Sequence, residues 1–226
     1  LISIILSCKG ETGDKGAQGP TGPEGEAGSI VMQFQNGVYP YYTYAGCQDT
    51  YLDSYNSNTN NAISTNIIVG TAPSANGRIV IKFDLSSIMP TNITVKRAYL
   101  TLKKEYILGA NTITAYALTK AFVETQATWN NRTNLSTWTT PGGDGDYNTT
   151  PMSNSIYFTT STTEFVFTLD PAIVQSWINN SATNYGILIK ADDEGMSANN
   201  LVRFYSSDYI INTSVRPKLT IYYTLP

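Results

Sequence analysis

The sequence contains no histidine, and only 14% of its 226 residues are charged, against roughly 25% in a typical soluble domain. The absence of histidine excludes the commonest general base, the Ser-His and Cys-His nucleophile pairs, and every metal site that depends on imidazole ligands. The net charge is -3, and the sequence has no run of Lys or Arg. Because such a chain has no means of following a phosphate backbone, we expect no nucleic-acid partner.

Cysteine is almost as scarce, with Cys8 and Cys47 as its two occurrences. Residues 1–7 are apolar or small and are too short to cross a bilayer, which needs about 20 residues, so they resemble the end of a secretory signal peptide. The run "ILSC" resembles a bacterial lipobox, which predicts a lipidated mature N-terminus at Cys8. A plain signal peptide with an incidental Cys8 is the alternative. If Cys8 carries lipid, Cys47 has no disulfide partner, and we expect it to be a small buried residue.

Glycine recurs at every third position from Gly10 to Gly28. Because only glycine fits at the axis of three wound polyproline-II chains, this period predicts a collagen-like segment over residues 8–29, behind the lipidated cysteine. Two arrangements remain open. The segment is either a monomeric spacer with a reach of at most about 60 Å, or a stalk that assembles a homotrimer.

From residue 30 to residue 226 the sequence alternates apolar and polar residues, which is the period of half-buried strands. In "RIVIKFDL", Ile79, Ile81 and Phe83 share one face, whereas Val80, Lys82 and Asp84 share the other. The same alternation recurs in the segments "AYLTLKKEYI", "TEFVFTL", "YGILIKA" and "PKLTIYY". Many such strands with Gly, Pro and Asn between them predict an all-β domain, an antiparallel jelly-roll-like sandwich.

One segment breaks this pattern. In "TLDPAIVQSWINN", Asp170 can cap a helix that has Pro171 at its first position, and the apolar residues then fall on one stripe. We expect a short helix that closes one end of the sandwich. Trp177 on this stripe is expected to plug the core rather than to bind a ligand.

The order and spacing of these segments resemble a known family. The segments are "QDTYLDSYNSNTNN", "GRIVIKFDLSSIMP", "VKRAYLTLKK", "FVETQATWNNRT", "WTTPGGDGD", "FTLDPAIVQSWINN", "YGILIKADDEG", "VRFYSSDY" and "RPKLTIYY", and they cover about residues 46–224. Together they resemble the DNRLRE domain, also classed among carbohydrate-binding modules, although Phe122 stands where that family usually has another aromatic residue. The resemblance implies a jelly-roll-like sandwich that binds polysaccharide or occurs beside polysaccharide-active enzymes and surface proteins.

Two acidic loops are candidates for metal binding. The loop "GGDGDYN" offers Asp144 and Asp146, and the loop "KADDEGMS" offers Asp192, Asp193 and Glu194. Closely spaced oxygen ligands among glycines suit Ca²⁺, so a structural calcium ion is one expectation and plain solvated turns are the other. A glycosidase would need two carboxyl groups about 5 to 10 Å apart across a cleft. Nothing in the sequence singles out such a pair, and we expect no enzymatic activity.

In proteins of the type that the resemblance implies, sugar rings usually stack on exposed aromatic side chains. The candidates are Tyr41, Tyr42 and Tyr44 in the loop "VYPYYTYAG", together with Trp138 and Tyr147 near the glycine-rich loop. Aromatic residues of a sandwich also fill its core, and Trp129 is expected to do so. Trp138 and Tyr147 are the two that we expect to be exposed.

The leading functional hypothesis is a non-catalytic lipoprotein, anchored in the bacterial outer membrane through Cys8, whose sandwich binds polysaccharide at the cell surface. The alternative is a structural or accessory subunit that docks on a larger surface protein, such as an adhesin, a secretion machine or a gliding-motility assembly. Sandwich edges and Tyr-rich faces suit a protein partner equally well.

Overall fold

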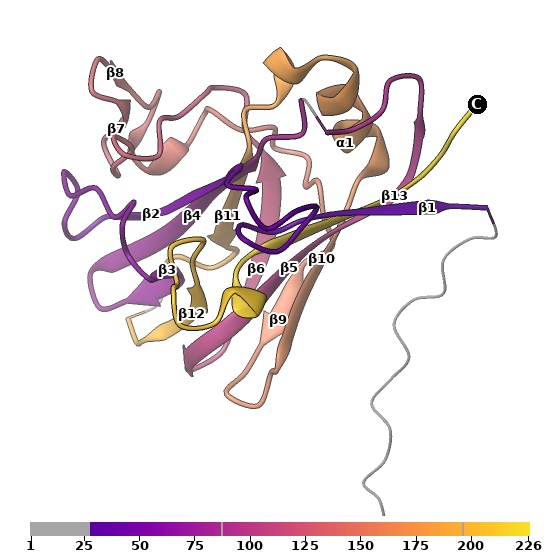
Figure 1. The fold of residues 1–226 in the computed structure, drawn as a ribbon. Coiled ribbons are helices and arrows are strands. Elements are labelled where there is room, and N and C mark those ends of the chain that lie inside the picture. Colours follow the sequence, from indigo (N-terminus) through magenta and orange to yellow (C-terminus); the bar gives the residue numbers. More distant parts are fainter. Residues whose placement is uncertain (1–27, 87, 196) are drawn as a thin grey trace, which may run out of the picture.

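The computed structural model describes residues 28–226, apart from residues 87 and 196. Within these residues the chain forms an antiparallel, almost wholly β fold (Figure 1). The strands are β1 (Ile30–Phe34), β2 (Cys47–Asp53), β3 (Asn66–Ala72), β4 (Ala75–Phe83), β5 (Thr94–Leu108), β6 (Asn111–Ala117), β7 (Asn131–Thr133), β8 (Ser136–Thr137), β9 (Ile156–Phe158), β10 (Glu164–Leu169), β11 (Ile187–Ala191), β12 (Asn200–Tyr205) and β13 (Lys218–Thr224). The helix α1 spans Pro171–Asn179, and the 3-10 helices are η1 (Pro141–Gly143), η2 (Ser181–Thr183) and η3 (Thr213–Val215). The predicted all-β class and jelly-roll-like sandwich are confirmed.

The longest strand, β5, pairs with three other strands. Its first half lies between β13 and β10, with Leu100 opposite Leu219 on one side and Phe167 on the other. Its second half pairs with β12, where the register shifts between Arg203 and Phe204. Because a single twisted strand serves both halves, the sheet curls back on itself and encloses one main core.

Strand β4 holds the other half of the fold together. Strand β2 runs along one side of β4 and β11 along the other, so that Ile81 lies opposite both Asp49 and Ile187. The free edge of β2 is occupied by side chains. Asn36 bonds both the N–H and the carbonyl of Cys47, and Glu124 accepts from the N–H of Asp49. These side chains satisfy backbone groups that an open edge would leave exposed.

The predicted strand faces are confirmed for the inner side of β4, where Ile79, Ile81 and Phe83 are buried in the main core. On its outer side Lys82 and Asp84 reach the surface, but Val80 is fully buried. The chain between β6 and β9 covers this outer side and forms a second apolar cluster. Its buried members are Leu52, Val80, Leu118, Phe122, Ala127, Trp138 and Leu188.

The helix that breaks the strand pattern is also confirmed. The side chain of Asp170 accepts a hydrogen bond from the N–H of Ala172 at 2.8 Å, which caps the first turn of α1. Val174 and Trp177 are buried against the main core, so the prediction that Trp177 plugs the core is confirmed.

Strand β1 begins at Ile30. The predicted signal remnant at residues 1–7, the lipidated Cys8 and the collagen-like segment through residue 27 lie outside the described residues. Cys47 is buried, as expected, and carries a free thiol. Within the described part of the chain, no helix has the length and apolar character that crossing a membrane requires.

Candidate functional site

Arg78 joins the two predicted acidic loops to the outer face of β4. Its side chain is 3% exposed, and its guanidinium donates to Glu194 at 2.7 Å, to the carbonyl of Gly142 at 2.8 Å and to Asp144 at 3.0 Å. The half-buried ring of Trp129 lies 5.1 Å from the guanidinium. A buried charge needs such compensation, and Arg78 finds it in partners from both loops.

Lys190 adds a second positive charge beside the same carboxylates. Its ammonium lies 3.7 Å from Asp144, 3.9 Å from Glu194 and 3.5 Å from the hydroxyl of Tyr147. Burial acts to raise the pKa of Asp144, but the hydrogen bond and charge of Arg78, helped by Lys190 and Tyr147, hold that pKa below its ordinary value. Three of the predicted site residues, Asp144, Glu194 and Tyr147, are thus brought together, but as an ion-pair network.

The other acidic residues of these loops have local partners. Asp146 is buried and accepts from the N–H and the hydroxyl of Thr139, both at 2.7 Å. Asp192 accepts from a threonine hydroxyl on β6, and Asp193 from the backbone N–H two residues further on. Across residues 28–226, with 87 and 196 left aside, no group of three or more His, Cys, Asp or Glu side chains is placed to hold a metal ion. The carboxylates of both loops thus have protein groups as partners.

Two of the predicted sugar-binding aromatic residues are buried. Trp138, which was expected at the surface, is 2% exposed, and its indole N–H donates to the carbonyl of Thr128 at 2.9 Å. Tyr44 packs against Phe34 with ring centroids 5.7 Å apart, and its hydroxyl donates to the carbonyl of Asp84. Neither ring can offer a face to a sugar, because each fills a gap between a loop and a strand. Tyr147 is half-buried beside Lys190.

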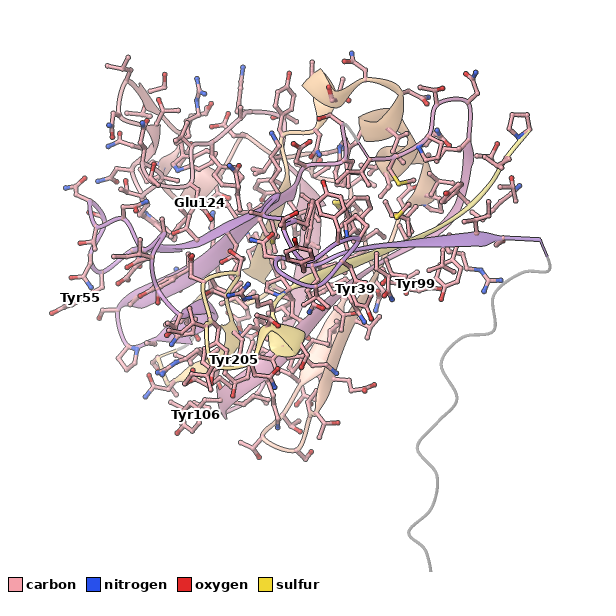
Figure 2. All side chains as sticks on the ribbon, viewed as in Figure 1. Tyr39, Tyr55, Tyr99, Tyr106, Glu124 and Tyr205 are labelled. Carbon is pink, nitrogen blue, oxygen red and sulfur yellow. The ribbon has the colours of Figure 1, made fainter. Side chains whose placement is uncertain are left out.

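Tyr41 and Tyr42 are exposed, with 48% and 84% of their surface accessible. Both lie in the loop between β1 and β2. Other exposed tyrosines, including Tyr55 and Tyr106, project from distant parts of the surface (Figure 2). The exposed rings are therefore scattered, and a binding site has to be sought where one of them adjoins a hollow.

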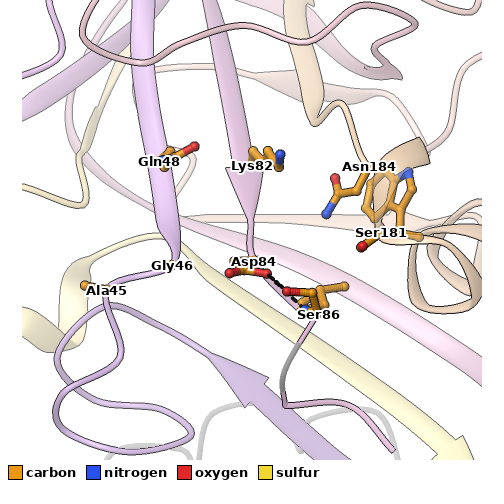
Figure 3. Close-up of a pocket in the computed structure, with 10 residues that line it drawn as sticks. Ala45, Gly46, Gln48, Lys82, Asp84, Ser86, Ser181 and Asn184 are labelled. Carbon is orange, nitrogen blue, oxygen red and sulfur yellow. Dashed lines mark hydrogen bonds between the residues drawn. The ribbon is translucent and has the colours of Figure 1, made fainter. Parts of the chain in front are cut away.

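A hollow of about 340 Å³ lies beside the Tyr41 loop, and we call it the Asp84 pocket. Its lining comes from the start of β2, the end of β4 and the chain from α1 to η2. Figure 3 shows Gln48 and Lys82 on neighbouring strands, with Asn184 and Ser181 on the facing segment. The lining residues are Ala45, Gly46, Gln48, Lys82, Asp84, Leu85, Ser86, Trp177, Ser181 and Asn184.

The charge of Asp84 is fixed by its neighbours. Its carboxylate accepts from the hydroxyl of Ser86 at 2.7 Å and from the N–H of the same residue at 2.9 Å. These hydrogen bonds outweigh partial burial and, with the charge of Lys82, lower the pKa of Asp84. The pocket therefore holds a stable carboxylate beside an ammonium group at neutral pH.

Asn184 gives the pocket an unsatisfied acceptor. The residue is 6% exposed, and its amide N–H donates to the carbonyl of Phe83 at 2.9 Å. Its Oδ1 is buried and has no hydrogen-bond partner among the described residues. A buried acceptor without a donor costs about 1–3 kcal/mol. Because Oδ1 is shielded from solvent, a ligand could donate to it only after the Asn184 side chain moved.

A second hollow of about 280 Å³ adjoins the first and shares Ala45, Gly46 and Asp84 with it. Tyr41 and Tyr44 contribute to its lining. The two hollows together place the exposed ring of Tyr41 next to the charged side chains of the Asp84 pocket.

Residues 49–221 match the family model of the Disaggregatase related repeat domain. The chain belongs to this family. The predicted membership in the DNRLRE family is therefore wrong, because alternating strands and Gly/Asp loops are common to many antiparallel sandwiches. The match begins at residue 49 and lends no support to a collagen-like repeat, so that prediction is withdrawn with the family. No curated protein matches the chain.

In this disaggregatase-related repeat domain, the Arg78 network and most of the Asp84 pocket lie within the matched residues, whereas the tyrosine loop precedes them. Lys82, Asp84 and Asn184 were not predicted as site residues. Lys82 and Asp84 alternate with apolar residues and looked like an ordinary solvent-facing side of a strand. Asn184 follows the helix by several residues, and no signal in the sequence places it opposite β4.

Proposed function

We propose that this disaggregatase-related repeat domain is a non-catalytic module that binds polysaccharide, with a saccharide unit in the Asp84 pocket. The observation that carries the proposal is one hollow that combines fixed charges, amide groups and hydroxyl groups with the indole of Trp177. Ligand pockets measure about 300–1,000 Å³, so a hollow of about 340 Å³ suits a small number of sugar rings.

The chemistry of the lining fits sugar hydroxyl groups, which both donate and accept hydrogen bonds. Lys82 can donate, Asp84 can accept, and Gln48 can do both. Charge-assisted hydrogen bonds are the stronger class, so Lys82 and Asp84 would contribute most. Tyr41 lines the adjoining hollow and offers a ring face to a neighbouring sugar unit.

The family name relates the repeat to a disaggregatase, which raises the question of catalysis. Hydrolysis of a glycosidic bond uses two carboxyl groups that flank it. Among the residues that line the pocket, Asp84 supplies the carboxylate and no second one accompanies it. This composition supports recognition as the role of the pocket.

For the location of the protein, we propose display on the bacterial outer membrane through lipid on Cys8, which lies in the "ILSC" run. Several acyl chains, at about 0.8 kcal/mol per buried CH₂, would hold the chain on the membrane. Mass spectrometry of Cys8 in membrane material tests this separately from sugar binding. An unmodified thiol in soluble material would contradict it.

A second candidate is docking on a larger surface protein. It is favoured by Ile210 and Ile211, which are adjacent and 79% and 83% exposed. Two adjacent isoleucines in water are unfavourable for an isolated loop, and contiguous exposed apolar residues often mark protein interfaces. Replacing both with Ser would abolish capture of such a partner and leave sugar binding intact.

A glycan array probed with the full chain, followed by calorimetry on each retained glycan, tests the proposal. We expect Asp84→Asn and Lys82→Gln each to weaken binding about tenfold or more, since each removes a charge-assisted hydrogen bond. Tyr41→Ala should weaken it less. The matched controls are Glu164→Gln on β10 and Tyr157→Ala on β9, which alter exposed residues outside the pocket.

If the chain retains no glycan and captures one stoichiometric protein partner from intact membranes, sugar binding is rejected and docking is supported. Release of shortened glycan by the wild-type chain would contradict the non-catalytic role. Equal loss of binding in the pocket variants and in the controls would place the site elsewhere.

A further inference from the structure

Asp49 is a buried carboxyl group on the inner face of β2, with 1% of its surface exposed. Its Oδ2 accepts a hydrogen bond from the backbone N–H of Ser207 at 2.8 Å, 158 residues further along the chain. Its Oδ1 is buried and finds no hydrogen-bond partner in the described part of the chain. One half of this carboxyl group therefore ties β2 to the segment after β12, and the other half is unsatisfied.

The titratable groups around Asp49 are acidic. The thiol of Cys47 lies 3.8 Å from Oδ2, and Glu124, labelled beside β2 in Figure 2, accepts from the N–H of Asp49 at 2.6 Å. Asp208 follows the bonded Ser207, and its charge also acts on Asp49. From β4, the residue opposite is the apolar Ile81. The positive charge of Arg216 acts on Asp208, and that of Arg203 acts on Tyr51, on the same strand as Asp49.

We propose that Asp49 is a proton-controlled latch, which holds the segment 206–208 against β2 when the carboxyl group is protonated and releases the segment as the pH rises. Three features of the geometry support a proton as the controlling ligand. The carboxyl group is enclosed, one oxygen has no donor, and its acidic neighbours do not form a metal-binding group within the described residues.

Burial raises the pKa of Asp49 to about 7. Hydrogen bonding with Ser207 acts to lower this pKa, whereas the charges of Glu124 and Asp208 act to raise it further. In an opened segment the carboxyl group meets water, and its pKa returns toward the ordinary value of about 3.9. Opening is then favoured by ionisation. The population of the open form should rise by up to about tenfold per pH unit between pH 5 and 7, and should level off above that range.

Hydrogen bonds without a titratable group limit how far segment 206–208 can open. Ser206 donates from its N–H to the carbonyl of Thr65 and from its hydroxyl to the carbonyl of Ser64. The connection that follows segment 206–208 contains Arg216, which donates to the carbonyl of Asn36 at 3.0 Å. Asn36 begins the loop that carries Tyr41 and Tyr42, so release would also loosen one wall beside the Asp84 pocket.

Amide hydrogen exchange of Ser207 in the full chain tests the latch directly, between pH 5 and pH 8 and after correction for intrinsic exchange. We expect its protection to fall by up to about tenfold per pH unit below pH 7 in the wild type. Asp49→Asn should show protection that does not vary with pH. Glu164→Gln, which changes an exposed carboxylate on β10, is the matched control and should follow the wild type.

Asp208→Asn provides a second variant in case Asp49→Asn does not fold. Removing that negative charge lowers the pKa of Asp49, so the plateau should begin at a lower pH than in the wild type. Protection of Ser207 that is independent of pH in the wild type would overturn the latch. So would a pH dependence that Asp49→Asn retains.

The consequence for ligand binding rests on the proposed function and is measured apart from it. Affinity for a glycan found on the array should fall from pH 6 to pH 8 in the wild type and should not do so in Asp49→Asn. If no glycan binds, the proposed function fails while the exchange result still decides the latch. If the exchange of the Ser207 amide follows the expected pattern but glycan affinity does not change with pH, the latch is supported and its coupling to the pocket is refuted.

Discussion

Arg78 donates to the carboxylate of Glu194, 116 residues further along the chain, at 2.7 Å. The same guanidinium also reaches Asp144, so one buried cation gathers two loops that lie far apart in the sequence. Each loop alone has the composition of a calcium site. Their shared partner explains why both are acidic, since a buried guanidinium beneath them requires carboxylates.

Arg78→Met should destabilise the fold by about 3–5 kcal/mol, because it leaves Glu194 and Asp144 without their main counter-charge. Urea unfolding followed by tryptophan fluorescence measures this loss. Arg203→Gln is the matched control, since Arg203 forms a half-exposed pair with Glu105 at 3.5 Å. That change should cost about 1 kcal/mol or less. Equal losses in the two variants would show that the Arg78 network is not the anchor of the loops.

Gly142→Ala should disturb the same region through the backbone. Gly142 has a φ of +82°, and a Cβ built there would lie 2.7 Å from the ring of Trp129. We expect a loss of about 1–3 kcal/mol from the strained conformation, with a change in the fluorescence of the folded state. Gly195→Ala is the control, because the nearest atom to its added Cβ, the Oδ1 of Asp193, would be 3.5 Å away. A tolerated alanine at 142 would contradict the close packing on Trp129.

Asp49 should make the fold less stable as the pH rises. Its pKa is about 7 in the folded protein and about 3.9 in the unfolded chain, so the folded state holds this proton more tightly. Its contribution therefore falls between about pH 4 and pH 7 and is constant above that range, a difference of a few kcal/mol. The difference in unfolding free energy between wild type and Asp49→Asn, measured at pH 5 and pH 8, should change accordingly. The same difference at both pH values would contradict the assignment.

The thiol of Cys47 should be unreactive in the folded protein. Burial raises its pKa well above the ordinary range, and the charges of Asp49 and Glu124 add to that shift. In a Cys8→Ser chain, reaction with Ellman's reagent should proceed at the rate of structural opening and should accelerate in urea. Immediate reaction in buffer would mean that the region around β2 is open to solvent.

Asp170→Ala should destabilise α1, because it removes the side chain that accepts from Ala172 at 2.8 Å. The expected cost is about 1 kcal/mol, within the range seen for lost helix caps. Since Trp177 on this helix lines the Asp84 pocket, glycan affinity should fall as well. Asp170→Asn, which keeps an accepting oxygen, should restore most of the stability.

The strands and the helix could be predicted because their patterns are local. Ile79, Ile81 and Phe83 alternate with polar residues, and a strand has no other way to bury them together. Asp170 and the apolar stripe after it define α1 in the same way. The burial of Trp138 could not be predicted, because it depends on a long loop folding back over Val80 and Leu188.

The candidate site was predictable only in part for the same reason. Tyr41 lines the hollow next to the pocket, and its tyrosine-rich loop was the reason for predicting it. Lys82 and Asp84 looked like any solvent-facing strand residues, and Asn184 had no distinguishing context. The DNRLRE resemblance failed because it rested on features that sandwiches share, whereas the family match weighs the whole of residues 49–221.

The sequence by itself determined an almost entirely β chain with one capped helix, since a period of two and a helix cap need nothing beyond neighbouring residues. The tertiary structure alone decided where the charges went. It set Asp144 and Glu194 on Arg78, enclosed Asp49 beside Ser207, and brought Lys82 and Asn184 to one pocket. The physical reason is that an ionisable side chain takes its role from the partners and the burial it finds in space, and these partners lie up to 158 residues away.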